Sequence, residues 1–157
     1  MLAPKRLIVL TILALTAMTF LAPGTAAAQQ AKVIEMDGTD QLKFTVTEIT
    51  ARPGQQITVK LTTVSDMPAA AMSHNFVLLA ADADATKVVQ ASATKADNEY
   101  IAPEMKDKII AYTGMAGGGE TVEVTFTAPE EPGEYTYVCT FPGHFLAGMK
   151  GTLIVKG

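Results

Sequence analysis

The 157 residues carry 12 basic side chains against 16 acidic ones, an acidic balance that argues against a partner such as nucleic acid. Hydrophobic residues make up 48% of the chain, which is enough for one buried core. The single cysteine, Cys139, excludes an intrachain disulfide and needs another explanation.

The first 28 residues have the pattern of a secretory signal peptide. Two basic residues precede an apolar stretch over residues 7–22, and small residues before position 29 provide a cleavage site. The stretch is short for a membrane-spanning helix of about 20 residues, although a retained anchor stays an alternative. We expect cleavage after Ala28 and export of the mature chain. The mature domain, residues 29–157, then has ten basic and sixteen acidic side chains and a formal charge of −6.

Short stretches of alternating apolar and polar residues predict an all-β fold. Such alternation over residues 42–46, 57–61 and 122–126 is typical of half-buried strands in an antiparallel sheet. Pro-Gly pairs at 53–54 and 132–133 predict type II turns. Further strands are expected at residues 32–36, 74–79, 108–112, 134–139 and 151–156.

Residues 81–104 interrupt this rhythm. They are rich in Ala, Lys, Gln and Asp, and Val88 and Val89 are their main apolar pair. We interpret the segment as a helix-containing excursion from the sheet. Seven or eight short strands with one such excursion favour a β-sandwich.

The chemistry of the chain is concentrated after the predicted strand at 134–139. Cys139, His144 and Met149 follow one another at spacings of five residues, and a Pro-Gly pair turns the loop between them. The other histidine of the chain, His74, starts the predicted strand 74–79. A thiolate, two imidazoles and a thioether are the ligand set of a blue-copper site, whereas zinc seldom takes a thioether.

Each of these residues has an ordinary structural explanation when taken alone. Cys139 and Met149 could be core side chains, His74 a hydrogen-bonded residue at a strand end, and His144 a solvated loop residue. Together, however, they use the only cysteine and both histidines of the chain. Coincidence is therefore the weaker explanation, and one copper ion per chain is expected.

Two segments carry a family resemblance that extends over essentially the whole mature chain. Residues 139–144 with 149–153, and residues 72–78, resemble the copper loop and the first-histidine segment of azurin-type cupredoxins. The excursion over residues 81–112 is similar to the azurin flap. The resemblance implies a Greek-key sandwich, one mononuclear type 1 copper and one-electron transfer in the bacterial periplasm or on the extracellular side, with no enzymatic activity.

The resemblance also implies roles for neighbours of the ligands. Asn75 is similar to the asparagine that ties the first-histidine segment to the cysteine loop, and the backbone N–H of Phe141 would donate to the thiolate. The spacing from His144 to Met149 is one residue longer than in azurins and is similar to the auracyanin branch. Ser73 stands where azurins have glycine, and its backbone carbonyl is a further candidate axial ligand.

Three other functions compete with electron transfer. A periplasmic copper-handling protein would deliver or store the ion, and Met67, Met72 and Met115 favour it because thioethers bind cuprous copper. A copper oxidase or reductase would need a second ligand set, for which the chain has no further cysteine or histidine. A sandwich domain without a metal is the third.

The expected partners are an electron donor and an electron acceptor, both redox proteins, and not a small-molecule substrate. We expect them to dock on an apolar patch around His144, and we expect the chain to be a monomer. The patch would consist of Phe141, Pro142, Phe145, Leu146 and Ala147.

Overall fold

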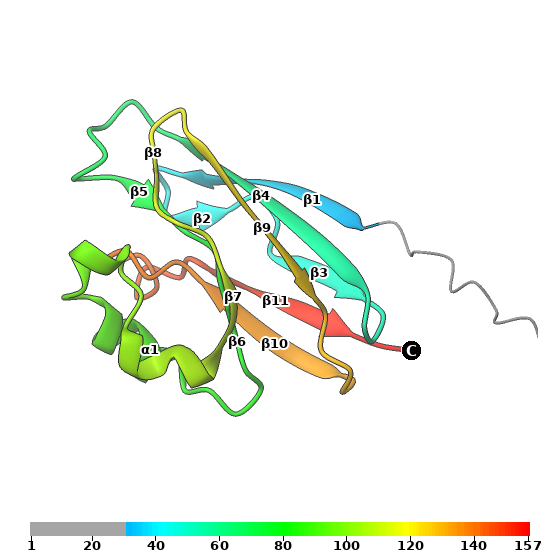
Figure 1. Ribbon diagram of the computed structural model, residues 1–157. Coiled ribbons are helices and arrows are strands. Elements are labelled where there is room, and N and C mark those ends of the chain that lie inside the picture. The colour runs from blue at the N-terminus through cyan, green and yellow to red at the C-terminus, as the bar shows by residue number, and fades with distance from the viewer. Residues whose placement is uncertain (1–30) are drawn as a thin grey trace, which may run out of the picture.

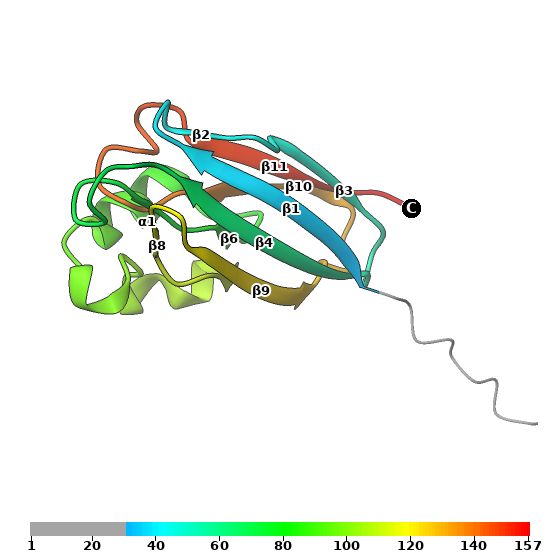
Figure 2. The same cartoon turned by 90° about the horizontal axis from the view of Figure 1, so that it is seen from above.

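Two β-sheets packed face to face form the body of the computed structural model, which describes residues 31–157 (Figure 1). The strands are Lys32–Thr39 (β1), Lys43–Phe44 (β2), Glu48–Ala51 (β3), Gln56–Val64 (β4), Ser73–His74 (β5), Val77–Leu79 (β6), Ile109–Tyr112 (β7), Ala116–Gly117 (β8), Thr121–Thr127 (β9), Gly133–Val138 (β10) and Lys150–Val155 (β11). The first sheet has the order β2-β1-β4-β9 and the second the order β3-β11-β10-β6-β7, while β5 and β8 form a separate pair. Seen from above, β1 and β4 pass in front of β10 and β11 (Figure 2).

The two packed sheets confirm the predicted β-sandwich. Eight strands in the described part of the chain have three or more residues, which agrees with the seven or eight expected. The predicted signal peptide, residues 1–28, lies outside the described residues, as do the first two residues of the expected mature domain. Every helix within residues 31–157 is too short or too polar to pass through a lipid bilayer.

The alternation in β4 shows how the sequence builds the core. Ile57, Val59 and Leu61 point between the sheets and are fully buried, whereas the polar residues between them are partly exposed. On the outer face, the hydroxyls of Thr58 and Thr125 are hydrogen-bonded across β4 and β9 at 2.8 Å. Apolar side chains of β4, β9, β10 and β11 therefore fill the space between the two sheets.

The expectation of purely antiparallel strands is wrong at two places. β1 runs parallel to β4 along its whole length, and β3 runs parallel to β11. The chain reaches β3, which belongs to the second sheet, before it returns to the first sheet as β4. This crossing gives β1 and β4 the same direction, which no local pattern encodes.

The strand expected over residues 74–79 is two strands. His74 in β5 pairs with Ala116 of β8, whereas Val77 and Leu78 in β6 pair with β7 and β10 of the second sheet. Between them, the N–H of Phe76 donates to the hydroxyl of Thr113 at 3.0 Å. The break takes His74 away from the second sheet and toward the end of the sandwich.

Only the first of the two predicted type II turns has the required geometry. Gly54 has a φ of +66°, and the N–H of Gln55 donates to the carbonyl of Arg52 at 3.1 Å. Gly133 has no positive φ, because it is the first residue of β10 and pairs with Val155.

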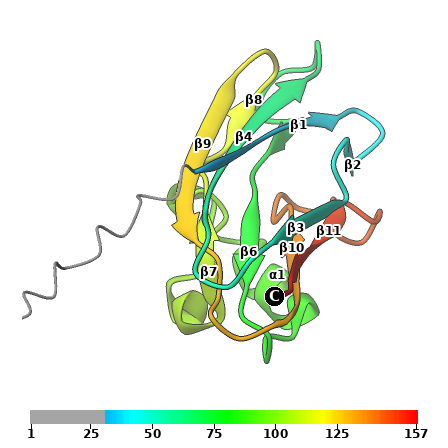
Figure 3. The same ribbon diagram turned by 90° about the vertical axis from the view of Figure 1, so that its right-hand side faces the viewer.

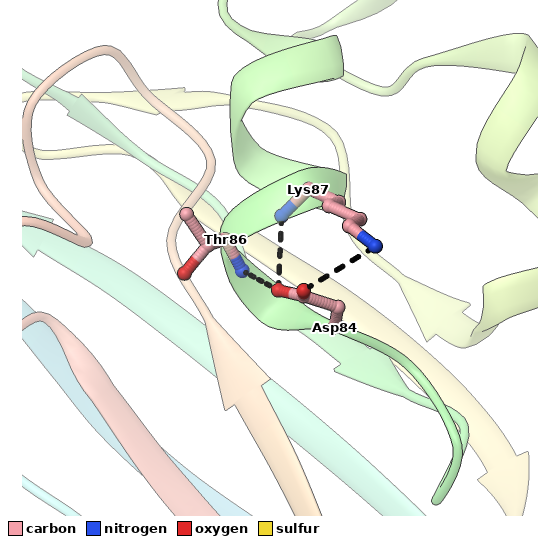
Figure 4. Close-up of polar contacts among 3 residues, drawn as sticks. All are labelled: Asp84, Thr86 and Lys87. Carbon is pink, nitrogen blue, oxygen red and sulfur yellow. Dashed lines mark hydrogen bonds and ion pairs between the residues drawn. The ribbon is translucent and has the colours of Figure 1, made fainter.

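The helix-containing excursion is confirmed and covers the outer face of the second sheet. It contains α1 (Ala85–Ser92) and two 3-10 helices, Ala96–Asn98 and Pro103–Lys108. Asp84 caps α1, since its carboxylate accepts from the N–H groups of Thr86 at 3.0 Å and Lys87 at 3.2 Å (Figure 4). Val88 and Val89 pack with apolar side chains of β6 and β10. Figure 3 shows α1 beside these two strands. The flap thus buries the face of these strands that the first sheet does not reach.

Candidate metal centre

Three potential metal ligands converge at one end of the sandwich. His74 ends β5, Cys139 directly follows β10, and His144 lies in the loop from β10 to β11. The two Nδ1 atoms are 3.2 Å apart, and Cys139 Sγ lies 3.5 Å from His144 Nδ1 and 3.9 Å from His74 Nδ1. Nitrogen and sulfur ligands bound about 2.0–2.3 Å from one ion in a plane are about 3.5–4.0 Å apart. The three residues therefore fit one metal ion within a few tenths of an ångström.

A close approach of the first sheet fixes the ring of His74. Gly38 in β1 lies against this ring, and a Cβ atom at that position would be 2.5 Å from His74 Cδ2. His74 Nε2 is the one buried side-chain nitrogen or oxygen in residues 31–157 without a hydrogen-bond partner. With Nδ1 bound to a metal, the proton of the imidazole would be on Nε2.

The loop from Cys139 to Met149 is held by its own backbone. The N–H of His144 donates to the carbonyl of Phe141 at 3.1 Å, and the N–H of Met149 donates to the carbonyl of His144 at 3.0 Å. The carbonyl of Met149 accepts from the N–H of Cys139 at 3.2 Å. These hydrogen bonds join Met149, which is fully buried, to two of the converging residues, Cys139 and His144.

Asn75 connects the two segments that carry the ligands. Its amide oxygen accepts from the backbone N–H of Thr140 at 2.9 Å, and its amide nitrogen donates to the Thr140 hydroxyl at 2.8 Å. The same nitrogen lies 3.3 Å from the carbonyl of Glu99 in the flap. Ser73, buried beside His74, donates its hydroxyl to the carbonyl of Ala69 at 2.6 Å. The neighbours of His74 and Cys139 are therefore fixed to one another and to the flap.

Burial controls the proton affinity of the three candidate ligands. It lowers the pKa of His144 to about 4, and it lowers that of His74 to about 4 with help from the positive charge of His144. The carboxylate of Asp40 and the Thr39 carbonyl act in the opposite direction on His74, although that carbonyl is not in hydrogen-bond geometry with Nε2. Both imidazoles are therefore neutral at pH 7, as metal ligands must be.

The thiol of Cys139 resists ionisation in the absence of a metal. Burial raises its pKa to about 12, and the backbone N–H groups of Asn75 and Phe141 lower it by a smaller amount. A metal ion that binds the sulfur would displace the proton and supply the missing positive charge. The donor set and its burial thus favour a strongly bound metal over a free reactive thiol.

The outer side of the loop is apolar, but its side chains point in different directions. Leu146 is 81% exposed, Pro142 and Ala147 are also exposed, and only 4% of His144 reaches the surface. Phe145, expected in an exposed patch, instead packs partly against the flap cluster, with Lys150 Nζ 5.8 Å from its ring centroid. Phe141 is also buried, and its ring lies 4.6 Å from that of His144.

Sequence reasoning missed three residues near the candidate centre: Gly38, Thr140 and Lys43. Gly38 and Lys43 belong to the β1–β2 hairpin, and Lys43 Nζ lies 3.0 Å from the carbonyl of Ala147. Nothing in the pattern around these two residues indicates that Gly38 lies against His74 or that Lys43 contacts a loop 104 positions away. Thr140, adjacent to Cys139, was the one residue with a usable signal.

A family model for copper binding proteins of the plastocyanin/azurin family matches residues 30–156. The chain belongs to this family. It is 38% identical to auracyanin-A of Chloroflexus aurantiacus over 74% of its own length and 69% of that protein. It is 36% identical to azurin of Pseudomonas aeruginosa over 78% of its own length and 84% of that protein.

Solved structures agree with these relatives. The structure of auracyanin A, described as a "blue" copper protein, matches with a TM-score of 0.69 and 38% identity, covering 79% of this chain and 98% of that one. An auracyanin B structure matches with a TM-score of 0.70 and 34% identity, covering 81% and 90%. The chain is therefore a copper-binding protein of the azurin and auracyanin type, a class of electron carriers and not of enzymes.

Proposed function

We propose that the chain shuttles single electrons between larger redox proteins, with one copper ion held by His74, Cys139 and His144. The observation that carries this proposal is the convergence of two neutral imidazoles and one thiol in a buried place, with 3.2–3.9 Å between their ligand atoms. Copper, when bound, supplies a one-electron couple between its +1 and +2 states. Met149 would be a further, weakly bound axial ligand, and the backbone carbonyl of Ser73 is another candidate for an axial contact.

The surrounding residues suit a carrier because they hold the ligands in one geometry. Asn75 joins the two ligand segments, and the absence of a Cβ atom at Gly38 lets β1 lie directly against the ring of His74. We assign to the N–H groups of Asn75 and Phe141 the stabilisation of the thiolate, since both lower the pKa of Cys139. Ligands that do not move between oxidation states keep the reorganisation on electron transfer small.

Copper delivery or storage is the competing function. Met67 is 40% exposed and could receive cuprous copper, but Met72 is buried and the thiol has no exposed surface. A site for delivery needs an accessible, exchangeable ion, whereas burial of all three ligand atoms favours a retained one.

Repeated reduction and oxidation in the presence of a cuprous chelator separates the two functions. The copper-loaded protein should show an intense blue thiolate-to-copper band, lose it on reduction and recover it on oxidation without transfer of copper to the chelator. Stoichiometric release of copper on reduction would contradict the electron-carrier proposal and favour delivery.

We further propose that redox partners dock at the exposed part of the copper loop, formed by Pro142, Leu146 and Ala147. Three features support this surface: its side chains are apolar and exposed, it carries no charged group, and it belongs to the same loop as His144. Exposed apolar patches commonly mark interaction sites. The formal charge of −6 would add only a long-range electrostatic contribution to association, which salt screens.

Electron self-exchange at high salt tests this surface, because two like-charged copies must meet there. Leu146→Lys should slow self-exchange without moving the blue band. Val33→Lys is the matched control, since Val33 is 53% exposed and lies five residues along β1 from Gly38, roughly 17 Å from the site. Equal rates in the two variants would reject docking at the loop.

The expected signal peptide supports a place of action outside the cytoplasm. We therefore propose that the mature protein works in the periplasm or on the extracellular side, as a monomer. Mass spectrometry of the protein from the exported fraction should give an N-terminus at Gln29; an intact Met1 would favour the membrane-anchor alternative.

A further inference from the structure

The β1–β2 hairpin sends one lysine to the end of the copper loop. Lys43 Nζ lies 3.0 Å from the carbonyl oxygen of Ala147 and 3.3 Å from that of Gly148, across more than 100 residues of sequence. Both carbonyls immediately precede Met149. The hairpin therefore contacts the loop where the chain turns from His144 back into β11.

These carbonyls end a helix-like turn. The N–H of Ala147 donates to the carbonyl of Gly143 at 3.1 Å, and the N–H of Gly148 donates to that of Phe145 at 2.9 Å. Carbonyls at the end of such a turn point away from it and carry partial negative charge, so a cation placed there is stabilising. The Gly148 carbonyl also accepts from the N–H of Lys150 at 3.0 Å, and Lys43 adds a charged donor to it.

Gly148 is adapted to this contact. Its φ of +95° lies in the region that favours glycine, and a Cβ atom there would be 2.5 Å from Lys43 Nζ. In the described part of the chain, no carboxylate lies within ion-pairing distance of Lys43. The ammonium is thus directed to the loop and not to a surface ion pair.

Met149 transmits the effect of this contact toward the ligands. Its N–H is bonded to the carbonyl of His144, and its carbonyl accepts from the N–H of Cys139. A shift of the preceding peptide would therefore move the backbone that joins Met149 to two of the proposed ligands. Gly38, in the other strand of the same hairpin, lies against the ring of His74.

We propose that Lys43 is a positioning residue for the copper loop, residues 139–149. This inference rests on the proposed copper site but not on any identified partner. Its ammonium fixes the peptides at Ala147 and Gly148 and so the placement of Met149. Its positive charge also favours the less highly charged, reduced ion.

The test compares Lys43→Met, which keeps most of the side-chain volume but removes the donor and the charge, with Lys43→Arg, which keeps both. Lys156→Met is the control, because it removes the same charge from an exposed residue next to the last strand. The first readout uses the metal-free protein: amide hydrogen exchange at Ala147, Gly148 and Met149 against amides of β4. The second is the reduction potential of the copper-loaded protein at low and high salt, together with its visible spectrum.

Lys43→Met should speed exchange of the three loop amides by about tenfold, leave β4 unchanged and lower the reduction potential, also at high salt. Lys43→Arg should keep the exchange rates and the reduction potential close to those of the wild type, and Lys156→Met should change neither. Unchanged loop exchange in Lys43→Met overturns the proposal, including the case in which the potential shifts only at low salt. If the wild-type protein bound no copper, the proposed function would fail, while the exchange experiment would still decide the role of Lys43.

Discussion

The interior between the sheets and the metal end of the sandwich are both buried but differ in what they bury. Residues such as Ile57 and Leu153 make the space between the sheets almost wholly apolar. Of the eight buried polar side chains in residues 31–157, five lie in the two ligand segments: Ser73, His74, Asn75, Thr140 and His144. The apolar interior is stable without any partner, whereas the metal end concentrates groups whose burial is unfavourable unless they are bonded.

This difference separates stability from function within one small domain. The Asn75–Thr140 bonds satisfy part of the metal end, but His74 Nε2 has no partner and the Cys139 thiol is held far from its ionised form. A metal that binds only the folded state would stabilise it against unfolding, and its binding free energy would offset the cost of burying these polar groups. Substitutions in the two regions should therefore separate loss of colour from loss of stability.

The largest effect on function should come from the thiol. Cys139→Ser should abolish the blue band completely, because the charge-transfer donor is removed, while the metal-free fold stays intact. The visible spectrum after copper loading measures the first effect and thermal unfolding of the apo-protein the second. A retained blue band in Cys139→Ser would refute the assignment of the metal centre.

The opposite result is expected in the apolar interior. Leu153→Ala should lower the free energy of unfolding by about 2–5 kcal/mol, because it leaves a cavity between the sheets, yet keep the blue band. Denaturant unfolding of the apo-protein and the visible spectrum measure the two effects. Loss of colour in the folded variant would show that the two regions are not separable.

Asn75 should show both effects, because it lies in the metal end but acts through structural hydrogen bonds. Asn75→Leu should lower the free energy of unfolding by about 1–3 kcal/mol, since it leaves the N–H of Thr140 without its partner. It should also change the position or intensity of the blue band. Thr58→Val, which breaks the exposed bond to Thr125, is the control and should cost less than about 1 kcal/mol. An unchanged band in Asn75→Leu would mean that the tie does not shape the site.

The two histidines should make the metal-free protein sensitive to acid. Folding lowers their pKa from 6.5 to about 4, so between these values the unfolded chain binds protons that the folded chain does not. The free energy of unfolding should therefore fall as the pH falls through this window, on the order of 2 kcal/mol after allowance for solvent screening. Denaturant unfolding between about pH 6.5 and pH 5 avoids most carboxyl titration. A flat profile there, in the wild type or in Leu153→Ala, would contradict the prediction.

Met149 should have the smallest effect of the proposed ligands. Met149→Leu should keep copper and the blue band and shift the reduction potential, upward on balance because a drier, more apolar site disfavours the doubly charged ion. Cyclic voltammetry of the two proteins measures the shift. A potential identical to that of the wild type would exclude Met149 as the axial ligand.

The sequence by itself determined the chemistry and the class of fold. The ligand types and the loop spacing are local, because Cys139, His144 and Met149 lie within one connection between two strands. The alternation over β4 and β9 and the loss of this rhythm over residues 81–104 are local too, which is why the sandwich and its flap could be predicted.

Only the tertiary structure decided how distant segments meet. The parallel pairing of β1 with β4, the break between His74 and Val77, the close approach of Gly38 and the contact from Lys43 all depend on partners remote in sequence. The same holds for Phe145 and Leu146, equally apolar neighbours of which one packs on the flap and the other faces solvent. A residue's pattern with its near neighbours encodes its strand or turn, but its burial and contacts depend on which strands pack against it, and that is a property of the whole chain.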